Sequence, residues 1–184
     1  MTETATGSIA QGAGKSTGST VSMDFAGSAH GKDEVSLLVT FMLGDQTYGG
    51  DILQIQEVSG VSHITRVPHV KDYIKGVTNL RGNIVPTIDL RTRLNIDSDK
   101  GDASSQQIMI ARTTQGLIGY IVDAVREVIS VPQDAIEPTP EDWLDADHKY
   151  FVGIAKMEDS LVTIVDFNRV IQADGALLDE LKAG

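Results

Sequence analysis

The chain has 184 residues, a formal net charge of −11 and no cysteine. The acidic balance argues against binding to nucleic acid or to an anionic membrane surface, and the lack of cysteine excludes disulfides, thiolate chemistry and cysteine-based zinc sites. No basic segment followed by an apolar run opens the sequence, and no apolar run approaches the roughly 20 residues that cross a bilayer. These features predict a cytoplasmic protein that binds other proteins and does not insert into a membrane directly.

Gly, Ser, Thr and Ala dominate residues 1–33, which carry too little apolar surface to offset the entropy of ordering a chain. We therefore expect a disordered leader. It contains GAGKST, which is similar to the end of a phosphate-binding loop, so a small nucleotide-binding protein using Gly14 to Thr17 is the alternative function. That loop needs a glycine five positions before Gly14, where Ile9 stands. The pattern also lacks the preceding strand and following helix, which disfavours this alternative.

From Glu34 the sequence consists of short β-branched and aliphatic runs separated by Gly, Pro and polar residues. A first series contains VSLLVTFML, QTYGGDI, GVTNL and NIVPTIDL, and after the polar link NIDSDKGDASS a second series contains QQIMIAR, LIGYIVDAVREVISV, YFVGIAKM and SLVTIVDF. This density of short runs predicts a mainly β fold made of small barrels or a sandwich. The final GALLDELKAG predicts a C-terminal helix over about residues 174–183.

The two series repeat each other. At an offset of 70, Gly49 corresponds to Gly119 and Glu57 to Glu127, and at an offset of 77 the run IVPTIDL corresponds to LVTIVDF. Two ordered blocks with apolar positions in phase predict a duplicated β unit of about 70 residues. We expect one lobe over about residues 35–97 and a similar lobe over about residues 105–172, packed together.

Apolar residues in each half also recur at intervals of three. Ile52, Ile55 and Val58 have this spacing. The second half repeats it at Val122, Val125 and Val128. We expect each strand to run into a short helical or twisted turn whose apolar side faces one way.

Residues that could carry catalysis are sparse. The four histidines show no paired metal-ligand spacing, and the nucleophile motif G-x-S-x-G is absent from the sequence. Asp89 and Asp166 occupy matched ends of matched strands, where a carboxylate is expected to accept hydrogen bonds from nearby backbone N–H groups. The sequence therefore predicts a protein that is not an enzyme and needs neither a cofactor nor a metal.

One loop differs between the repeats. Arg81 stands beside Gly82 in NLRG, between two apolar runs, and the second repeat has Lys156 followed by Met157, Glu158 and Asp159 at the aligned positions. Symmetry that is broken at a single loop indicates an asymmetric site. A carboxylate such as that of Glu57 could hold the guanidinium group in a fixed orientation.

The segments FMLGDQTYGGDILQIQEV, ITRVP, YIKGVTNLRGNIVPTIDLR, GYIVDAVREVISV and YFVGIAKMEDSLVTIVDF resemble the CheW family of chemotaxis coupling proteins, over about residues 35–172. The resemblance implies a domain over residues 34–184 with two intertwined SH3-like five-stranded β-barrels, related by internal duplication, with short helices at the connections.

The same resemblance implies a non-enzymatic adaptor without a cofactor. Such an adaptor bridges the cytoplasmic tips of chemoreceptors to the regulatory domain of the histidine kinase CheA, and is recruited to membrane-associated signalling arrays. The fold also occurs as a module in CheA and in CheV-type proteins, but the length of this chain favours a coupling protein that stands alone. Flagellar and other pathways remain open alternatives.

Residue by residue, the resemblance implies that Arg81 and Glu57 take part in receptor coupling. It also implies an apolar groove for a receptor helix, with walls that include Ile52, Ile55 and Val122.

Three further positions, Gly76, Val58 and Gly82, are expected to contact a partner or to form turns, and a glycine at position 76 suits a tight turn. Gly50 departs from the family, in which an aliphatic residue is usual. We expect one wall of the first lobe to be less well packed there.

Overall fold

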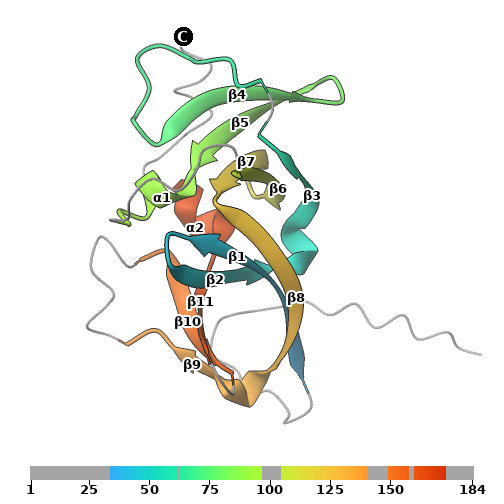
Figure 1. Ribbon diagram of the computed structural model, residues 1–184, viewed down its shortest axis with the longest axis vertical. Coiled ribbons are helices and arrows are strands. Elements are labelled where there is room, and N and C mark those ends of the chain that lie inside the picture. Colours follow the sequence, from blue (N-terminus) through green and yellow to red (C-terminus); the bar gives the residue numbers. More distant parts are fainter. Residues whose placement is uncertain (1–33, 62, 97–104, 141–148, 158–159, 173–184) are drawn as a thin grey trace, which may run out of the picture.

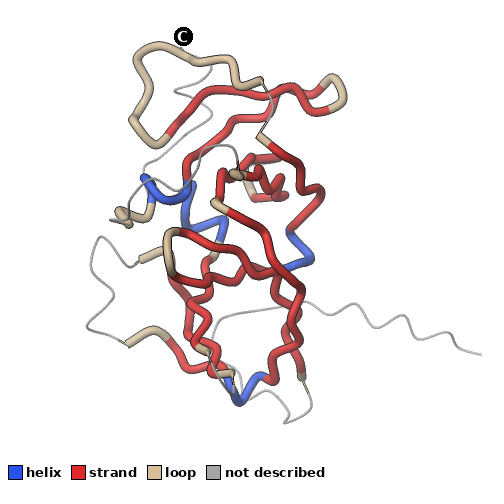
Figure 2. Tube along the Cα trace, in the orientation of Figure 1, coloured by secondary structure: helices blue, strands red, loops and turns tan. Residues whose placement is uncertain are grey.

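The computed structural model describes residues 34–61, 63–96, 105–140, 149–157 and 160–172, and most of them lie in strands (Figure 2). The strands are β1 (Val35–Leu43), β2 (Gln46–Asp51), β3 (Ile55–Gly60), β4 (Ile74–Leu80), β5 (Asn83–Asp89), β6 (Gln107–Thr113), β7 (Gly116–Val122), β8 (Ala124–Pro132), β9 (Ile136–Pro138), β10 (Phe151–Lys156) and β11 (Leu161–Val165). Short helical segments join them: η1 (Ile52–Gln54), α1 (Leu90–Arg93), η2 (Gln133–Ala135) and α2 (Phe167–Gln172).

Two predicted features lie outside the described residues. They are the leader over residues 1–33, which includes Gly14 to Thr17, and the C-terminal helix over residues 174–183.

The strands form two sheets, which occupy opposite ends of the long axis in Figure 1. Sheet A has the order β8-β1-β2-β11-β10-β9, and sheet B has the order β3-β6-β7-β5-β4. The hairpin β1–β2 therefore joins strands of the second half of the chain, and the hairpin β6–β7 joins strands of the first half. The ranges 35–97 and 105–172 do not coincide with the sheets, because each range gives strands to both. From here on, a lobe is the part of the molecule built on one sheet, so sheet A forms the six-stranded lobe and sheet B the five-stranded lobe.

The pairing register confirms the internal duplication. Within sheet A, β2 runs parallel to β11 with Gly49 opposite Ile164. In sheet B, β7 runs parallel to β5 with Gly119 opposite Thr87. Gly49 and Gly119 are 70 positions apart, and Thr87 and Ile164 are 77 positions apart, as the repeat offsets predict.

Three apolar clusters hold the fold together. One lies in sheet A and includes Leu38 and Ile164, and another lies in sheet B and includes Ile108 and Val85. The largest cluster draws residues from both sheets and includes Val39, the neighbour of Leu38 on β1. Successive side chains of a strand point to opposite faces, so β1 contributes to the core of its own lobe and to the core that the lobes share.

Gly50 lies beneath the ring of Phe167 in this shared core. A Cβ atom built at Gly50 would lie 2.4 Å from Cε2 of that ring, which is fully buried and packs on Tyr120 with ring centroids 4.9 Å apart. The expectation of a poorly packed wall at Gly50 is therefore wrong. The space that an aliphatic side chain would occupy is filled by a phenylalanine from the other end of the chain.

Arg93 joins the two halves where repeat-related residues meet. Its Nε and Nη2 atoms donate hydrogen bonds of 2.9 and 2.8 Å to the carbonyl oxygen of Val170. The guanidinium carbon lies 4.3 Å from the ring centre of Tyr73 and 5.0 Å from that of Tyr150. Arg93 and Val170 are related by the offset of 77, and so are the two tyrosines, so this stacked arginine marks the axis of the duplication.

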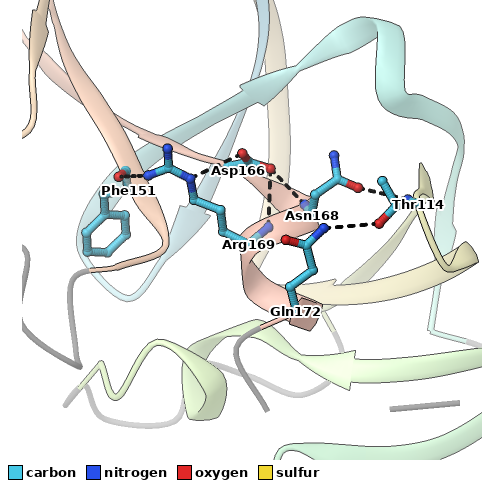
Figure 3. Close-up of polar contacts among 6 residues, drawn as sticks. All are labelled: Thr114, Phe151, Asp166, Asn168, Arg169 and Gln172. Carbon is cyan, nitrogen blue, oxygen red and sulfur yellow. Dashed lines mark hydrogen bonds and ion pairs between the residues drawn. The ribbon is translucent and has the colours of Figure 1, made fainter. Parts of the chain in front are cut away.

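Asp89 and Asp166 have the predicted structural role. An Oδ1 atom of Asp89 accepts a hydrogen bond of 3.1 Å from the N–H of Thr92 and caps α1. Asp166 accepts bonds from the N–H groups of Asn168 and Arg169, at 2.8 and 3.3 Å (Figure 3). Each aspartate ends a strand and begins a helix, which explains why the repeat keeps both.

Candidate partner-binding site

Arg81 and Gly82 form the two-residue turn of the β4–β5 hairpin. Both have positive φ angles, 51° and 90°, as a type I′ turn requires. The N–H of Gly82 donates a bond of 2.8 Å to Oδ1 of Asn79, which tightens the turn. A left-handed arginine costs about 1–2 kcal/mol relative to an ordinary conformation. The turn thus presents a long cationic side chain at a position that favours glycine or asparagine.

Glu57 holds the Arg81 side chain, as the sequence predicts. Its Oε2 atom lies 2.9 Å from Nη2 of Arg81, and the two side chains are 28% and 80% exposed respectively. Glu57 lies on β3 and Arg81 follows β4, which are the two edge strands of sheet B, so the ion pair closes the sheet. Because exposed pairs contribute about 0–1 kcal/mol to stability, its main effect is to orient the guanidinium group.

Ile52 and Ile55 are half-buried and pack against the shared core, but Val122 is only 1% exposed within it. Val122 is therefore a core residue and does not form part of a groove wall. Val58 is exposed, and burial alternates along β3. The pairing of β3 with β6 shifts register between Ile55 and Glu57, so Ile55 lies opposite Ala111 and Val58 lies opposite Met109, and these two partners share one face of β6. Ile55 and Val58 therefore face one way, as the spacing predicts, although Val58 is exposed.

Two exposed aliphatic residues extend this surface and were missed by sequence reasoning. Leu37 is exposed. Leu38 pairs with Asp51 in the antiparallel β1–β2 ladder, so continuing the register by one residue places Ile52 beside Leu37. Val128 on β8 is also exposed and pairs with Val39. Val39 points to the same face of β1 as Leu37, so Val128 lies on that face too. We call Leu37, Ile52, Ile55 and Val128 the apolar strip. The sequence VSLLVTFML has apolar residues on both faces of β1, so alternation could not identify the exposed members.

Gly76 lies inside β4 and not in a turn, which corrects the expectation for this position. A register shift interrupts the pairing of β4 with β5 between Ile74 and Gly76, and the φ angle of Gly76 is +138°. A Cβ atom at this position would lie 2.1 Å from the carbonyl oxygen of Thr65, which accepts a hydrogen bond from Val77. Gly76 is needed because a second backbone segment passes directly over it.

Several polar groups away from the hairpin serve the fold. The hydroxyl of Tyr120 donates a bond of 2.9 Å to the carbonyl oxygen of Phe167, and burial raises the pKa of this tyrosine well above its ordinary value. Asn168 and Gln172 on α2 bind Thr114 in the β6–β7 turn (Figure 3). In the part of the chain that the structure describes, no three His, Asp or Glu side chains are placed to share a metal ion. Likewise, no described helix has the length and apolarity needed to span a bilayer.

The sequence model of the CheW-like domain matches residues 37–175. The chain belongs to the CheW-like domain family. It is 34% identical over 142 residues to the chemotaxis protein CheW of Klebsiella aerogenes, covering 77% of this chain and 85% of that protein. It is also 34% identical over 140 residues to the CheW of Bacillus subtilis, covering 76% and 88% of the two chains.

A solved structure supports the same conclusion. The scaffolding protein TtCheW of Thermoanaerobacter tengcongensis has a TM-score of 0.71 and 34% identity to this chain, and the match covers 78% of this chain and 97% of that one. The predicted family and the mainly β, two-lobed fold are confirmed. The segment from Gly14 to Thr17 precedes the residues that match the CheW-like domain.

Proposed function

We propose that this member of the CheW-like family is a non-enzymatic chemotaxis adaptor. It couples the cytoplasmic tips of chemoreceptors to the regulatory domain of the histidine kinase CheA in signalling arrays. The observation that carries the proposal is the exposed Arg81, held by Glu57 on a strained turn of a domain that belongs to this family. The relatives' names, chemotaxis protein CheW and scaffolding protein TtCheW, support the same role.

The hairpin geometry suits recognition of another protein. Glu57 fixes the guanidinium group and leaves most of the Arg81 side chain in solvent. Arginine presents five N–H donors in a planar fork, so a pre-oriented guanidinium loses less entropy when a partner oxygen binds it. Retaining a left-handed arginine costs stability, which is consistent with a role in binding.

The apolar strip provides the second half of the proposed receptor site. An amphipathic helix lays aliphatic side chains spaced by three and four residues on such a surface. Leu37 and Val128 are exposed, whereas Ile52 and Ile55 are partly buried against the shared core. A receptor helix that packs here would remove Leu37 and Val128 from water. The net charge of −11 argues that recruitment to arrays depends on protein partners and not on anionic lipid or nucleic acid.

Reversing the charge of Arg81 tests this proposal. In a reconstituted array with receptor and CheA, Arg81→Glu should fold normally and lose most receptor-dependent kinase activation. Glu57→Lys should act similarly, and the double exchange should restore part of the activity if the two side chains act as a pair.

Lys156→Glu is the matched control, because Lys156 forms an exposed 2.6 Å ion pair with Glu137 in the other lobe. It should leave activation unchanged. Full activation by Arg81→Glu would contradict the proposed role of Arg81, and failure of the unmodified chain to bind either partner would contradict the adaptor function.

A further inference from the structure

We propose that a cavity in the six-stranded lobe binds one lysine or arginine side chain of a protein partner. The cavity lies between β1, the β2–η1 junction, β10 and the β11–α2 junction. Its lining residues are Ser36, Leu38, Asp51, Gln54, Val152, Ile164, Val165, Asp166 and Asn168. The adaptor function identifies the candidate partners, but the chemistry of the cavity is argued independently of that function.

The size and lining of the cavity match a long basic side chain. Its volume is about 270 Å³, below the roughly 300–1,000 Å³ of typical small-molecule sites. Buried aliphatic side chains such as Leu38 and Ile164 could contact the methylene stem, and the carboxylates of Asp51 and Asp166 could bind the cationic head. Lysine and arginine combine an apolar stem with a charged end in this way.

The duplicated lobe shows how the equivalent place is filled. There, Nζ of Lys75 on β4 lies 3.3 Å from Oδ2 of Asp89. At the offset of 77, Asp89 corresponds to Asp166 and Lys75 corresponds to Val152. The six-stranded lobe therefore keeps the aspartate but replaces the lysine with a shorter apolar residue.

Asp51 is a second carboxylate that the other lobe lacks. Its counterpart at the offset of 70 is the buried Ile121. Asp166 has a cation nearby, since Nε of the partly exposed Arg169 lies 3.5 Å from its Oδ2 atom. Among the described residues no lysine or arginine pairs with Asp51, whose Oδ1 accepts only the 2.9 Å bond from the N–H of Leu53. The cavity thus has one negative charge in excess.

Burial supports a site that awaits a cation. Desolvation raises the pKa of Asp51, and the hydrogen bond from Leu53 opposes this only partly. A bound ammonium or guanidinium group would favour the charged carboxylate and offset its desolvation. An anionic occupant would add like charge to Asp51 and Asp166.

The chemistry of the cavity can be tested with side-chain mimics. Titration of the full chain with n-butylammonium, followed by NMR, should give saturable shifts at the amides of Leu53, Asn168 and Arg169, and n-butanol should not. Asp51→Asn keeps an oxygen for the Leu53 cap and should weaken the apparent affinity about tenfold. Asp45→Asn removes one exposed charge from the β1–β2 turn and should change nothing. Equal shifts with butanol, or unchanged affinity in Asp51→Asn, would overturn the inference.

Filling the cavity from within provides a second variant. Val152→Lys installs the residue that stands at Lys75 in the other lobe, and should abolish the butylammonium shifts. Val152→Met, with a long apolar chain and no charge, separates the effect of charge from that of volume. If the methionine variant competes as well as the lysine variant does, charge recognition is wrong.

Binding to purified partners identifies the source of the side chain. Calorimetry with a receptor-tip fragment and with the CheA regulatory domain should show about tenfold weaker binding to one of them for Asp51→Asn, with Asp45→Asn unaffected. If both partners bind Asp51→Asn normally while Arg81→Glu loses coupling, the adaptor function stands and this inference fails. If butylammonium binds but neither affinity depends on Asp51, the cavity accepts free amines and the assignment to a protein partner is overturned.

Discussion

Replacing Gly50 with alanine tests how the two halves of the chain pack together. The added Cβ atom would lie 2.4 and 2.5 Å from Cε2 and Cζ of Phe167, well inside the contact distance of carbon atoms. The Phe167 ring is held between Tyr120, at 4.9 Å between centroids, and Phe41, at 6.3 Å. It can therefore yield only by displacing both neighbours or the backbone of β2.

Overpacking of this kind costs about 1–3 kcal/mol of unfolding free energy, which for a chain of this size lowers the melting temperature by roughly 2–12 °C. Urea denaturation and thermal unfolding both measure the effect. Gly60→Ala is the matched control, because nothing lies within 4 Å of a Cβ atom at that position. It should leave stability unchanged or raise it by up to about 1 kcal/mol.

A double-mutant cycle isolates the contact. Phe167→Leu installs the residue found at Leu90, which is the repeat-related position, and should cost about 1–2 kcal/mol for the lost ring. Combined with Gly50→Ala, it should destabilise the protein by less than the sum of the two single changes, by about 1–2 kcal/mol. Additive effects, or a Gly50→Ala variant as stable as Gly60→Ala, would refute the argument that Phe167 requires the glycine.

Three more predictions concern the hairpin, the crossing of β4 and the cavity. Arg81→Asn creates an Asn-Gly turn suited to positive φ angles, so urea denaturation should show an unchanged or higher unfolding free energy, by up to about 1 kcal/mol, together with weaker partner binding; a loss above 1 kcal/mol would contradict the strained-turn argument. Gly76→Ala should cost about 3 kcal/mol or more in thermal unfolding, because φ is +138° and Cβ would lie 2.1 Å from the Thr65 oxygen; a variant as stable as Gly60→Ala would disprove it. Burial raises the folded pKa of Asp51 above its ordinary 3.8, so the folded state binds this proton more tightly and stability falls as pH rises through the window above 3.8. Asp51→Asn should therefore raise the melting temperature at pH 7, and this gain should disappear below about pH 3.8; a pH-independent difference would exclude the titration of Asp51 as its cause.

The sequence predicted the duplication because the residue types along each strand repeat at a fixed spacing in the chain, and this spacing can be read without knowing which strands pair. Offsets of 70 and 77 align residues that occupy matched places in strands, and Gly49 and Gly119 prove to be paired in equivalent ways. Periodicity could not predict the exchange of hairpins between the sheets, which only the family resemblance implied through its intertwined barrels. A strand such as β3 has the same alternation whether it pairs with β2 or, as observed, with β6, so periodicity alone does not select the partner.

The candidate site shows the same division. The sequence pointed to the Arg81–Glu57 pair, because Arg81 has no counterpart in the second repeat and the family resemblance gives Glu57 as its acidic partner. The packing of Gly50 was not predictable, because its compensating residue, Phe167, is distant in sequence. Val122 was assigned to a groove by its repeat relation to Ile52, yet it is buried. Repeat symmetry fixes the place of a residue in a strand but does not fix what covers it.

The two lobes differ at repeat-related positions both in the shared core and on the surface. Tyr73 and Tyr150 are alike and stack on one guanidinium group, but that group belongs to Arg93, whose counterpart is Val170. The five-stranded lobe carries the Arg81 turn. In the six-stranded lobe, Val152 stands beside Asp166 at the position that corresponds to Lys75, and Asp51 adds a second carboxylate. A duplicated frame with two differently charged surfaces would let the proposed adaptor bind a different partner with each lobe.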